Sequence, residues 1–306
     1  MFKIYLLLTH PMILPINMFN IYEILFFIII CALVFKLLIY KIETLLLFHP
    51  TTVTENYISN IISKKEQEFK KKINSGIELK RHSVITPDCE SIDLLYFINP
   101  KTNKVILYSH GNAGNIYNHF SFIRKFGNEG SIVMYDYRGY GTSSGEPSEK
   151  GFYIDIKSVW DFVIDNLKIN PQNIILYGES LGCSMSAWLG KELVKNKDTL
   201  QFPKGIIIQS GFFNLKQMVS DFFSKYLTWF VYSKFDNINY VKKINNEIPI
   251  LVIHSLNDEL ISIKQPHKLV ADGKLSKDNF IIVKGSHNSP IYTEPEFNKL
   301  KFFLNN

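Results

Sequence analysis

Short apolar segments recur along the chain after Gly76, and they constrain the fold more than any other feature of the sequence. Each is long enough for a buried strand and too short for a helix. They lie at 105–108, 132–135, 174–177, 206–209, 250–253 and 280–283. Because continuous apolar strands that alternate with helices need cover on both faces, this pattern predicts an α/β fold with a mostly parallel sheet and helices on both of its faces.

The segments around these strands fit the same fold. Residues 77–85 and 91–98 alternate apolar and polar side chains on either side of Pro87-Asp88, which predicts a hairpin. In 152–167, apolar residues repeat at steps of three and four, so we expect a helix with one face toward the core. Right-handed crossovers place the chemistry of such a sheet at the carboxyl ends of its parallel strands.

One of these strand ends carries a serine. Strand 174–177 runs directly into GESLG at 178–182, and a helical stretch follows. In a G-x-S-x-G sequence between a strand and a helix, the glycines permit a sharp turn and the serine hydroxyl stays exposed near the positive end of the helix dipole. Ser180 is therefore the candidate nucleophile. A chance occurrence of so short a motif is the alternative.

A nucleophilic serine needs a base that an acid orients, and in this fold the order along the chain is serine, acid, histidine. Two histidines lie far enough along the chain: His267, in a helical stretch, and His287, in the loop GSHN after strand 280–283. A loop at the carboxyl end of a strand reaches the elbow more readily than a position in mid-helix. We therefore predict that His287 is the base.

The acid is expected in the loop after strand 250–253, which contains Asp258 and Glu259. Asp258 is the candidate because it faces the same edge of the sheet as His287. Glu259 is the alternative acid and is expected to face solvent. His254 ends the strand itself and is interpreted as structural.

A third loop, SHGNAGN at 109–115, follows strand 105–108. Negative charge that develops on a substrate carbonyl needs backbone N–H donors, one from the residue after the nucleophile and one from this loop. Leu181 and Asn112 are the candidate oxyanion-hole donors. The rival interpretation, a phosphate loop, needs G-x-x-x-x-G-K-[ST] or G-x-G-x-x-G spacing, and the loop has neither.

The N-terminal region differs from the rest of the chain. Residues 24–40 read ILFFIIICALVFKLLIY and carry one charge, Lys36, which lies near the end, where it can reach the membrane surface. Their number is close to the ~17–25 residues of a helix that crosses a bilayer. A buried core helix is the alternative, but a segment that is apolar all round would need a partner on every side. We predict a membrane anchor at 1–44, with the span at about 21–41.

Lysines are more frequent after this span than before it, so the positive-inside bias places the remainder of the chain in the cytosol. Residues 45–76 are expected to form a connector, and 77–306 the catalytic domain. Within the connector, KKEQEFKKK at 64–72 is interpreted as a solvated helix face, with contact to anionic lipid as the alternative.

Composition argues against several other classes of protein. The formal net charge is +6, but only three of the 34 Lys and Arg residues are Arg, the residue best suited to phosphate, so we expect no nucleic-acid partner. The cysteines, Cys31, Cys89 and Cys183, show no paired spacing, so we expect neither a disulfide framework nor a metal site. Cys183, just past the elbow, is interpreted as a core residue. No motif calls for a cofactor.

Taken together, the motifs resemble the α/β-hydrolase superfamily. HGNAGN at 110–115, YDYRGYGTSSGEPSE at 135–149, ILYGESLG at 175–182, the loop around Asp258 and GSHN at 285–288 carry the resemblance, which covers about residues 45–304. More narrowly, the chain resembles the membrane-anchored, Bem46-like branch of serine hydrolases and is similar to the related protein depalmitoylases. The depalmitoylases differ in having a Cys-rich, acylated N-terminus where this chain has a predicted span.

The resemblance implies a scaffolding role for Arg138 and Tyr140 in the YRGYG loop, with contact to the substrate as the alternative. It also implies a short lid at 211–240, where α/β hydrolases carry insertions. The lid is rich in aromatic residues, which are either ordinary helix core or the lining of an acyl-chain pocket. They are Phe212, Phe213, Phe222, Phe223, Tyr226, Trp229, Phe230 and Tyr232.

We therefore expect a membrane-anchored serine hydrolase that cleaves carboxylic esters or thioesters, with an acyl lipid or an acylated protein as substrate. Ser180 would attack, His287 would shuttle the proton, Asp258 would orient the imidazole, and water would hydrolyse the acyl-enzyme. The alternatives are a protein depalmitoylase and a catalytically silent α/β-hydrolase fold that binds a partner.

Overall fold

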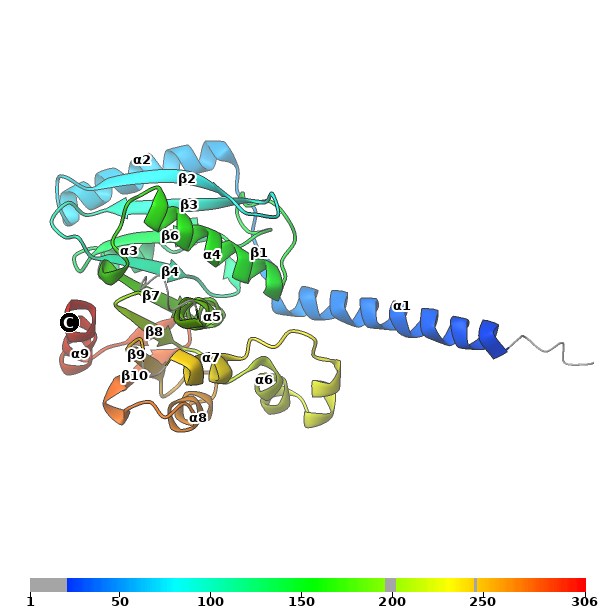
Figure 1. Ribbon diagram of the computed structural model, residues 1–306. Coiled ribbons are helices and arrows are strands. Elements are labelled where there is room, and N and C mark those ends of the chain that lie inside the picture. Colours follow the sequence, from blue (N-terminus) through cyan, green and yellow to red (C-terminus); the bar gives the residue numbers. More distant parts are fainter. Residues whose placement is uncertain (1–20, 196–201, 245–246) are drawn as a thin grey trace, which may run out of the picture. The chain divides into compact units, whose positions relative to one another are not determined.

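The structure is a computed structural model that describes residues 21–195, 202–244 and 247–306, and it separates into two compact units, Met1–Ile42 and Glu43–Asn306 (Figure 1). The first twenty residues of the predicted anchor lie outside the described residues. Helix α1 (Ile21–Leu47) begins in the first unit and ends in the second. By length and composition, its residues Glu23–Leu47 are sufficient to cross a membrane, and the side chains of its apolar stretch are exposed.

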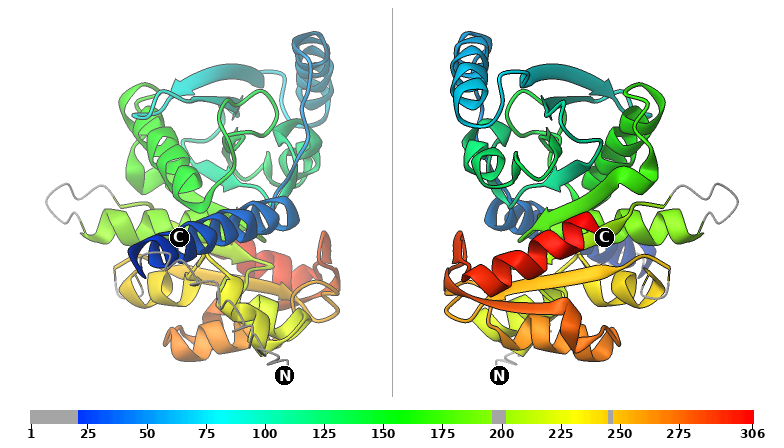
Figure 2. Two further views of the ribbon diagram at one scale, coloured as in Figure 1. Left: turned by 90° about the vertical axis from the view of Figure 1, so that its right-hand side faces the viewer. Right: turned by 90° about the vertical axis from the view of Figure 1, so that its left-hand side faces the viewer.

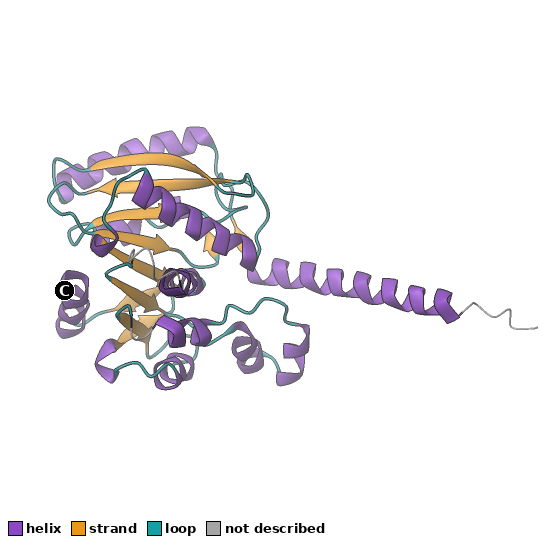
Figure 3. Cartoon of the chain, in the orientation of Figure 1, coloured by secondary structure: helices purple, strands orange, loops and turns teal. Residues whose placement is uncertain are grey.

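A mixed sheet forms the centre of the larger unit (Figure 3). Its strands are β2 (Glu78–Ile85), β3 (Ser91–Ile98), β4 (Val105–Ser109), β6 (Ser131–Tyr135), β7 (Ile174–Glu179), β8 (Gly205–Gln209), β9 (Ile250–Ser255), β10 (Phe280–Ser286) and β11 (Ser289–Ile291). In the described part of the chain these strands lie in the order β11-β10-β9-β8-β7-β4-β6-β3-β2. A separate pair, β1 (His49–Pro50) and β5 (Ala113–Gly114), is parallel.

The strand directions confirm the predicted α/β class. Strands β6, β4, β7, β8, β9 and β10 run parallel to one another, and β11 pairs antiparallel with β10. Strands β2 and β3 form the predicted antiparallel hairpin, which joins the sheet through β6. Each of the six predicted apolar segments is a strand, longer than predicted by one to three residues.

Helices cover both faces of the sheet (Figure 2). They are α2 (Glu55–Lys72), α3 (Phe120–Phe126), α4 (Glu149–Asp165), α5 (Gly182–Lys195), α6 (Leu215–Phe222), α7 (Asn237–Ile244), α8 (Lys264–Asp272) and α9 (Glu294–Asn305). Short 3-10 turns are η1 (Ile116–Asn118), η2 (Pro171–Asn173), η4 (Lys225–Phe230) and η5 (Lys277–Asn279). One core cluster holds residues of α4, α5, α7 and α8, and the other holds residues of α2, α3 and α9.

Strand β4 shows how the sequence builds both cores. Val105 and Leu107 belong to one cluster, whereas Ile106 and Tyr108 belong to the other. Because successive side chains of a strand point to opposite faces, an apolar run of this kind is stable only between two layers of helices.

Helix α4 forms where the apolar repeat in 152–167 predicts a helix. The hydroxyl of Ser148 accepts a hydrogen bond from the N–H of Gly151 and caps the first turn. Phe152, Ile156 and Val159, at steps of four and three, are fully buried against the sheet.

The predicted connector is wrong as a boundary, because much of it packs into the larger unit. Ile58 and Phe69 of α2 are fully buried, and the ring of Phe69 meets that of Phe97 edge-on at 5.6 Å. The compact unit therefore begins at Glu43 and not at residue 77. The many lysines of α2 conceal its apolar face in the sequence, although Lys64 and Lys71 are exposed as expected.

Arg138 belongs to the scaffold. Its Nε and Nη2 atoms donate to Oδ1 of Asp155 at 2.9 and 2.8 Å, and its Nη1 atom donates to Oδ2 of Asp88 at 2.8 Å. The side chain of Asp155 is completely buried. These bonds fix the loop after β6 to helix α4 and leave the guanidinium engaged with protein carboxylates.

We predict that Asp155→Asn lowers the free energy of unfolding of the full chain in detergent by about 3–5 kcal/mol, because Arg138 would lose its buried partner. The matched control is Asp161→Asn on the same helix, where an exposed pair with Lys157 contributes about 0–1 kcal/mol. Urea unfolding followed by circular dichroism measures both. Equal effects of the two substitutions would contradict this assignment.

Candidate active site

Ser180 lies at a strained turn between β7 and α5. Its φ is +53°, in the left-handed region that non-glycine residues rarely adopt. The N–H of Ser180 donates to the carbonyl of Gln209 at 2.9 Å, which ties the turn to the end of β8. Backbone strain of this kind persists only where the surroundings enforce it, and it is frequent at active sites.

The flanking glycines are needed because the backbone passes very close to its neighbours. A Cβ atom on Gly182 would lie 1.9 Å from the carbonyl oxygen of Ser109, and one on Gly178 would lie 2.4 Å from the carbonyl oxygen of Gly182. The start of α5 therefore rests directly on the end of β4. Cys183 is buried, as predicted, and its thiol donates to the carbonyl of Gly178 at 3.2 Å.

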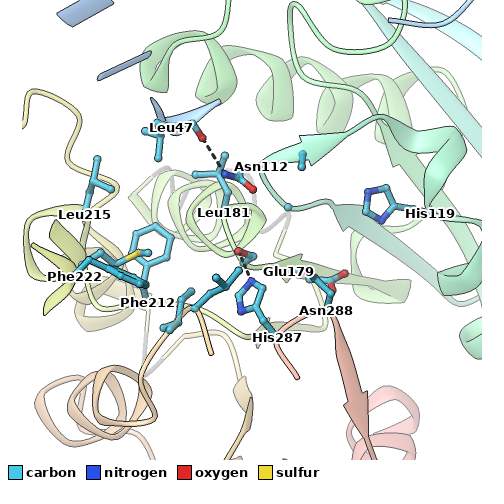
Figure 4. Close-up of a pocket in the computed structure, with 16 residues that line it drawn as sticks. Leu47, Asn112, His119, Glu179, Leu181, Phe212, Leu215, Phe222, His287 and Asn288 are labelled. Atoms are coloured by element: carbon cyan, nitrogen blue, oxygen red, sulfur yellow. Dashed lines mark hydrogen bonds between the residues drawn. The ribbon is translucent and has the colours of Figure 1, made fainter. Parts of the chain in front are cut away.

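The structure brings the three predicted catalytic side chains together (Figure 4 shows His287 between Leu181 and Asn288 at the cavity). Nε2 of His287 lies 3.0 Å from Oγ of Ser180, and its Nδ1 lies 2.8 Å from Oδ2 of Asp258. With its proton on Nδ1, the imidazole donates to Asp258, and Nε2 accepts the serine hydroxyl. This is the arrangement of nucleophile, base and orienting acid.

Asp258 is held as a carboxylate. Its side chain is buried, and its Oδ1 accepts the N–H groups of Leu260 and Ile261 at 2.9 and 2.7 Å. Burial alone would raise the pKa of Asp258, but the hydrogen bonds from His287 and from the backbone of Ile261 outweigh it and keep the pKa below its usual value. Asp258 is therefore ionised at neutral pH, as an acid that orients an imidazolium needs to be.

The other acid and histidine candidates from the sequence lie outside the series of Ser180, His287 and Asp258. Glu259 is exposed, as expected, but its Oε2 accepts the backbone N–H of His287 at 3.0 Å, so it positions the histidine loop. His254 is buried, with its Nε2 3.4 Å from Oδ2 of Asp258, and burial lowers its pKa, so it is neutral. Its Nε2 contacts the carbonyl of Ile261 at 2.8 Å, in keeping with a structural role. His267, on α8, packs edge-on against Phe280 of β10.

The loop after β4 is fixed around Asn112. The carbonyl of Asn112 accepts the N–H of His49 at 3.0 Å and the hydroxyl of Tyr140 at 2.8 Å, and its side-chain amide donates to the carbonyl of Leu47 at 3.0 Å. Among the described residues, the backbone N–H groups of Asn112 and Leu181 have no acceptor. Tyr140 therefore has the scaffolding role that the resemblance implied, and the structure adds that the loop it holds is the one at Asn112.

A cavity of about 380 Å³ opens at Ser180, and its two sides differ (Figure 4). Leu47, Phe212, Leu215 and Phe222 lie on one side, which is apolar, and Met218, Leu260 and Ile261 also belong to the apolar lining. The other side carries His119, Glu179 and Asn288. Of the eight aromatic residues named in the predicted lid, Phe212 and Phe222 line this cavity, whereas Phe213 is buried in the core.

Comparisons with known proteins agree with this architecture. Residues 135–286 match the prolyl oligopeptidase family. The uncharacterized protein R595 of Acanthamoeba polyphaga mimivirus is 36% identical over 217 residues, which cover 67% of this chain and 74% of that one. The human alpha/beta hydrolase domain-containing protein 17B is 32% identical over 165 residues, which span about half of either chain. The esterase Pf2001 of Pyrococcus furiosus, 18% identical, superposes with a TM-score of 0.60 over 85% of this chain and 97% of its own, which shows a shared fold.

The chain belongs to the α/β-hydrolase superfamily. Within it, the likeness to protein 17B supports the relation to the depalmitoylase-related group that the motifs indicated. The family match begins at Tyr135, so it includes Ser180 and Asp258 and ends one residue before His287.

On the polar side of the cavity lies the carboxylate of Glu179, the residue that precedes Ser180. The hydroxyl of Tyr108 donates to Glu179 and lies 3.2 Å from Nδ1 of His119. Burial, with a smaller effect from the nearby His110, lowers the pKa of His119 to about 4, so His119 is neutral at physiological pH. Sequence reasoning missed this cluster because its members come from three separate segments. Within the described ranges, no group of His, Cys, Asp and Glu is arranged to hold a metal ion.

We predict that Gly182→Ala destabilises the hydrolase by about 1–3 kcal/mol or more, because the added methyl group would overlap the backbone of Ser109. Gly111→Ala is the matched control, since its Cβ would meet Cβ of Ser180 at an ordinary 3.6 Å. Thermal unfolding of the two variants in detergent measures the difference. A Gly182→Ala protein as stable as Gly111→Ala would show that α5 does not rest on β4 as described.

Proposed function

We propose that this protein is a serine hydrolase that cleaves carboxylic esters or thioesters through an acyl-enzyme on Ser180. The observation that carries the proposal is the continuous hydrogen-bonded series Ser180, His287 and Asp258, with distances of 3.0 and 2.8 Å. A catalytically silent fold has no need for this series, for a serine in a strained conformation or for a buried carboxylate behind the histidine.

The geometry supports a two-step reaction. Nε2 of His287 takes the proton of Ser180 as Oγ attacks the substrate carbonyl, and the Asp258 carboxylate stabilises the imidazolium that forms. The N–H groups of Leu181 and Asn112 would hold the negative oxygen of the tetrahedral intermediate. The intermediate expels an alcohol or a thiol, which takes the proton from His287. Water then attacks the acyl-serine, with His287 again as the base, and releases the acid.

The two-sided cavity suggests how a substrate lies. Its volume of about 380 Å³ suits one small molecule or one chain. We assign the acyl group to the apolar side, near Phe212, Leu215 and Met218, because burying a CH₂ group there contributes about 0.8 kcal/mol. The leaving group then lies toward Glu179 and Asn288, where polar atoms line the wall.

We also propose that α1 anchors the hydrolase in a membrane. Support comes from its length, its apolar composition and the exposure of its side chains. The excess of lysines after the span supports a cytosolic position for the hydrolase unit. A lipid ester and an S-acylated protein are both suitable substrates for such an enzyme. The relation to protein 17B makes depalmitoylation the second candidate activity.

We expect that a fluorophosphonate probe labels the full-length protein and that Ser180→Ala abolishes both labelling and ester hydrolysis. Ser184→Ala is the matched control, because Ser184 lies one turn further along α5, buried and with no partner for its hydroxyl among the described residues. Its labelling should equal that of the unmodified protein. Competition by lipid esters, acyl-protein thioesters and small esters then ranks the substrate classes.

Folded protein that resists the probe would contradict the proposal, and so would labelling that persists in Ser180→Ala. Labelling that short-chain esters suppress and long-chain esters do not would contradict the assignment of the acyl group to the apolar side.

A further inference from the structure

A cluster of large apolar side chains projects from the lid segment next to the cavity. It consists of Phe222, at the end of α6, Phe223, which follows it, and Tyr226, Leu227 and Trp229 of η4, and we call it the aromatic rim. Trp229 is 88% exposed, Phe223 76% and Tyr226 72%. Soluble proteins rarely display so many large apolar residues together, and such clusters mark contact with a partner or a membrane.

The composition of the rim fits the interfacial layer of a membrane. Trp and Tyr are enriched there because one end of each ring is apolar and the other is polar. Lys225 extends over the ring of Tyr226, with Nζ 5.4 Å from its centroid. Between residues 215 and 234 there are three lysines and one aspartate, a net positive charge that anionic lipid headgroups attract.

The chain itself ties this surface to the end of its apolar segment. The carboxylate of Glu43, three residues after the apolar segment 24–40, accepts the N–H groups of Tyr232 and Ser233 at 2.6 and 2.8 Å. Trp229 lies only three residues before Tyr232, so its Cα is within roughly 10 Å of that point. Leu45 and Leu46, each 73% exposed, add apolar surface on the same stretch of chain.

The rim is also continuous with the cavity. Phe222 belongs to both, and Leu47, which follows Leu46, lines the apolar side of the cavity. The same few residues therefore connect the end of the apolar segment, the exposed aromatic surface and the place assigned to the acyl chain.

We propose that the aromatic rim inserts into the interfacial layer of the membrane and turns the apolar side of the cavity toward the lipid. An acyl chain then passes from the bilayer to Ser180 without crossing water. The proposal rests on the membrane anchor and the esterase activity proposed above. The experiment below distinguishes its failure from theirs.

The test uses the full chain in vesicles of phosphatidylcholine and phosphatidylserine, with or without brominated lipid as a quencher of tryptophan fluorescence. The protein has three Trp residues, of which Trp160 is buried and Trp188 stacks on Tyr153. Trp229→Phe removes only the exposed one. We expect bromine near the headgroup end of the acyl chains to quench the unmodified protein, and Trp229→Phe to lose most of that quenching.

Flotation of the same vesicles reports on the anchor separately. Protein that floats while Trp229 remains unquenched would overturn the proposal and leave the anchor intact, and this result is also expected if a second copy or another protein covers the rim. Protein that does not float would overturn both the anchor and the insertion of the rim.

A second readout uses the combined variant Phe223→Ser, Tyr226→Ser and Trp229→Ser, none of which lines the cavity. We expect fluorophosphonate labelling and hydrolysis of a short, soluble ester to stay unchanged, and hydrolysis of a long-chain ester in vesicles to fall about tenfold or more, equivalent to about 1.4 kcal/mol. Equal rates of the variant and the unmodified protein on the vesicle substrate would overturn the proposal. Absence of labelling in both proteins would instead refute the proposed activity.

Discussion

The close approach of α5 to β4 is the contact on which the site depends. Gly182 lies against the carbonyl of Ser109 with no room for a Cβ atom, and this forces the turn that holds Ser180 in a left-handed conformation. The same approach brings the residue after the serine next to the loop at Asn112. Two glycines and one strained serine thus place the nucleophile between the histidine loop and the N–H groups proposed for the oxyanion hole.

Much of this arrangement could be predicted from the sequence, because it depends on local patterns that repeat. The apolar runs predict the parallel strands, because a strand that is buried on both faces is apolar at nearly every position and is easily recognised in a sequence. Ser180, Asp258 and His287 could be found because each follows a strand at the same edge of the sheet. The hydrogen bonds among these three residues form because the strand order of the sheet brings the three loops together.

The rest depends on contacts between distant segments, which no local pattern encodes. Phe69 is buried in the core although its helix is highly charged, so the sequence predicts a catalytic domain that begins at residue 77, whereas the larger unit begins at Glu43. Tyr140 supports Asn112 across 28 residues of chain, and Leu47 joins the cavity from the end of α1. Glu259, expected to face solvent, binds the backbone of the histidine loop. Each of these contacts can be found only in the three-dimensional structure.

We propose above that Ser180 forms the covalent intermediate with the help of His287. Mass spectrometry of the full-length protein, quenched in acid during turnover of a slowly hydrolysed ester, tests it most directly. We expect an added acyl mass on the peptide that contains Ser180, and its loss in His287→Ala. Turnover with no acyl group on that peptide, or acylation that survives removal of the imidazole, would contradict it.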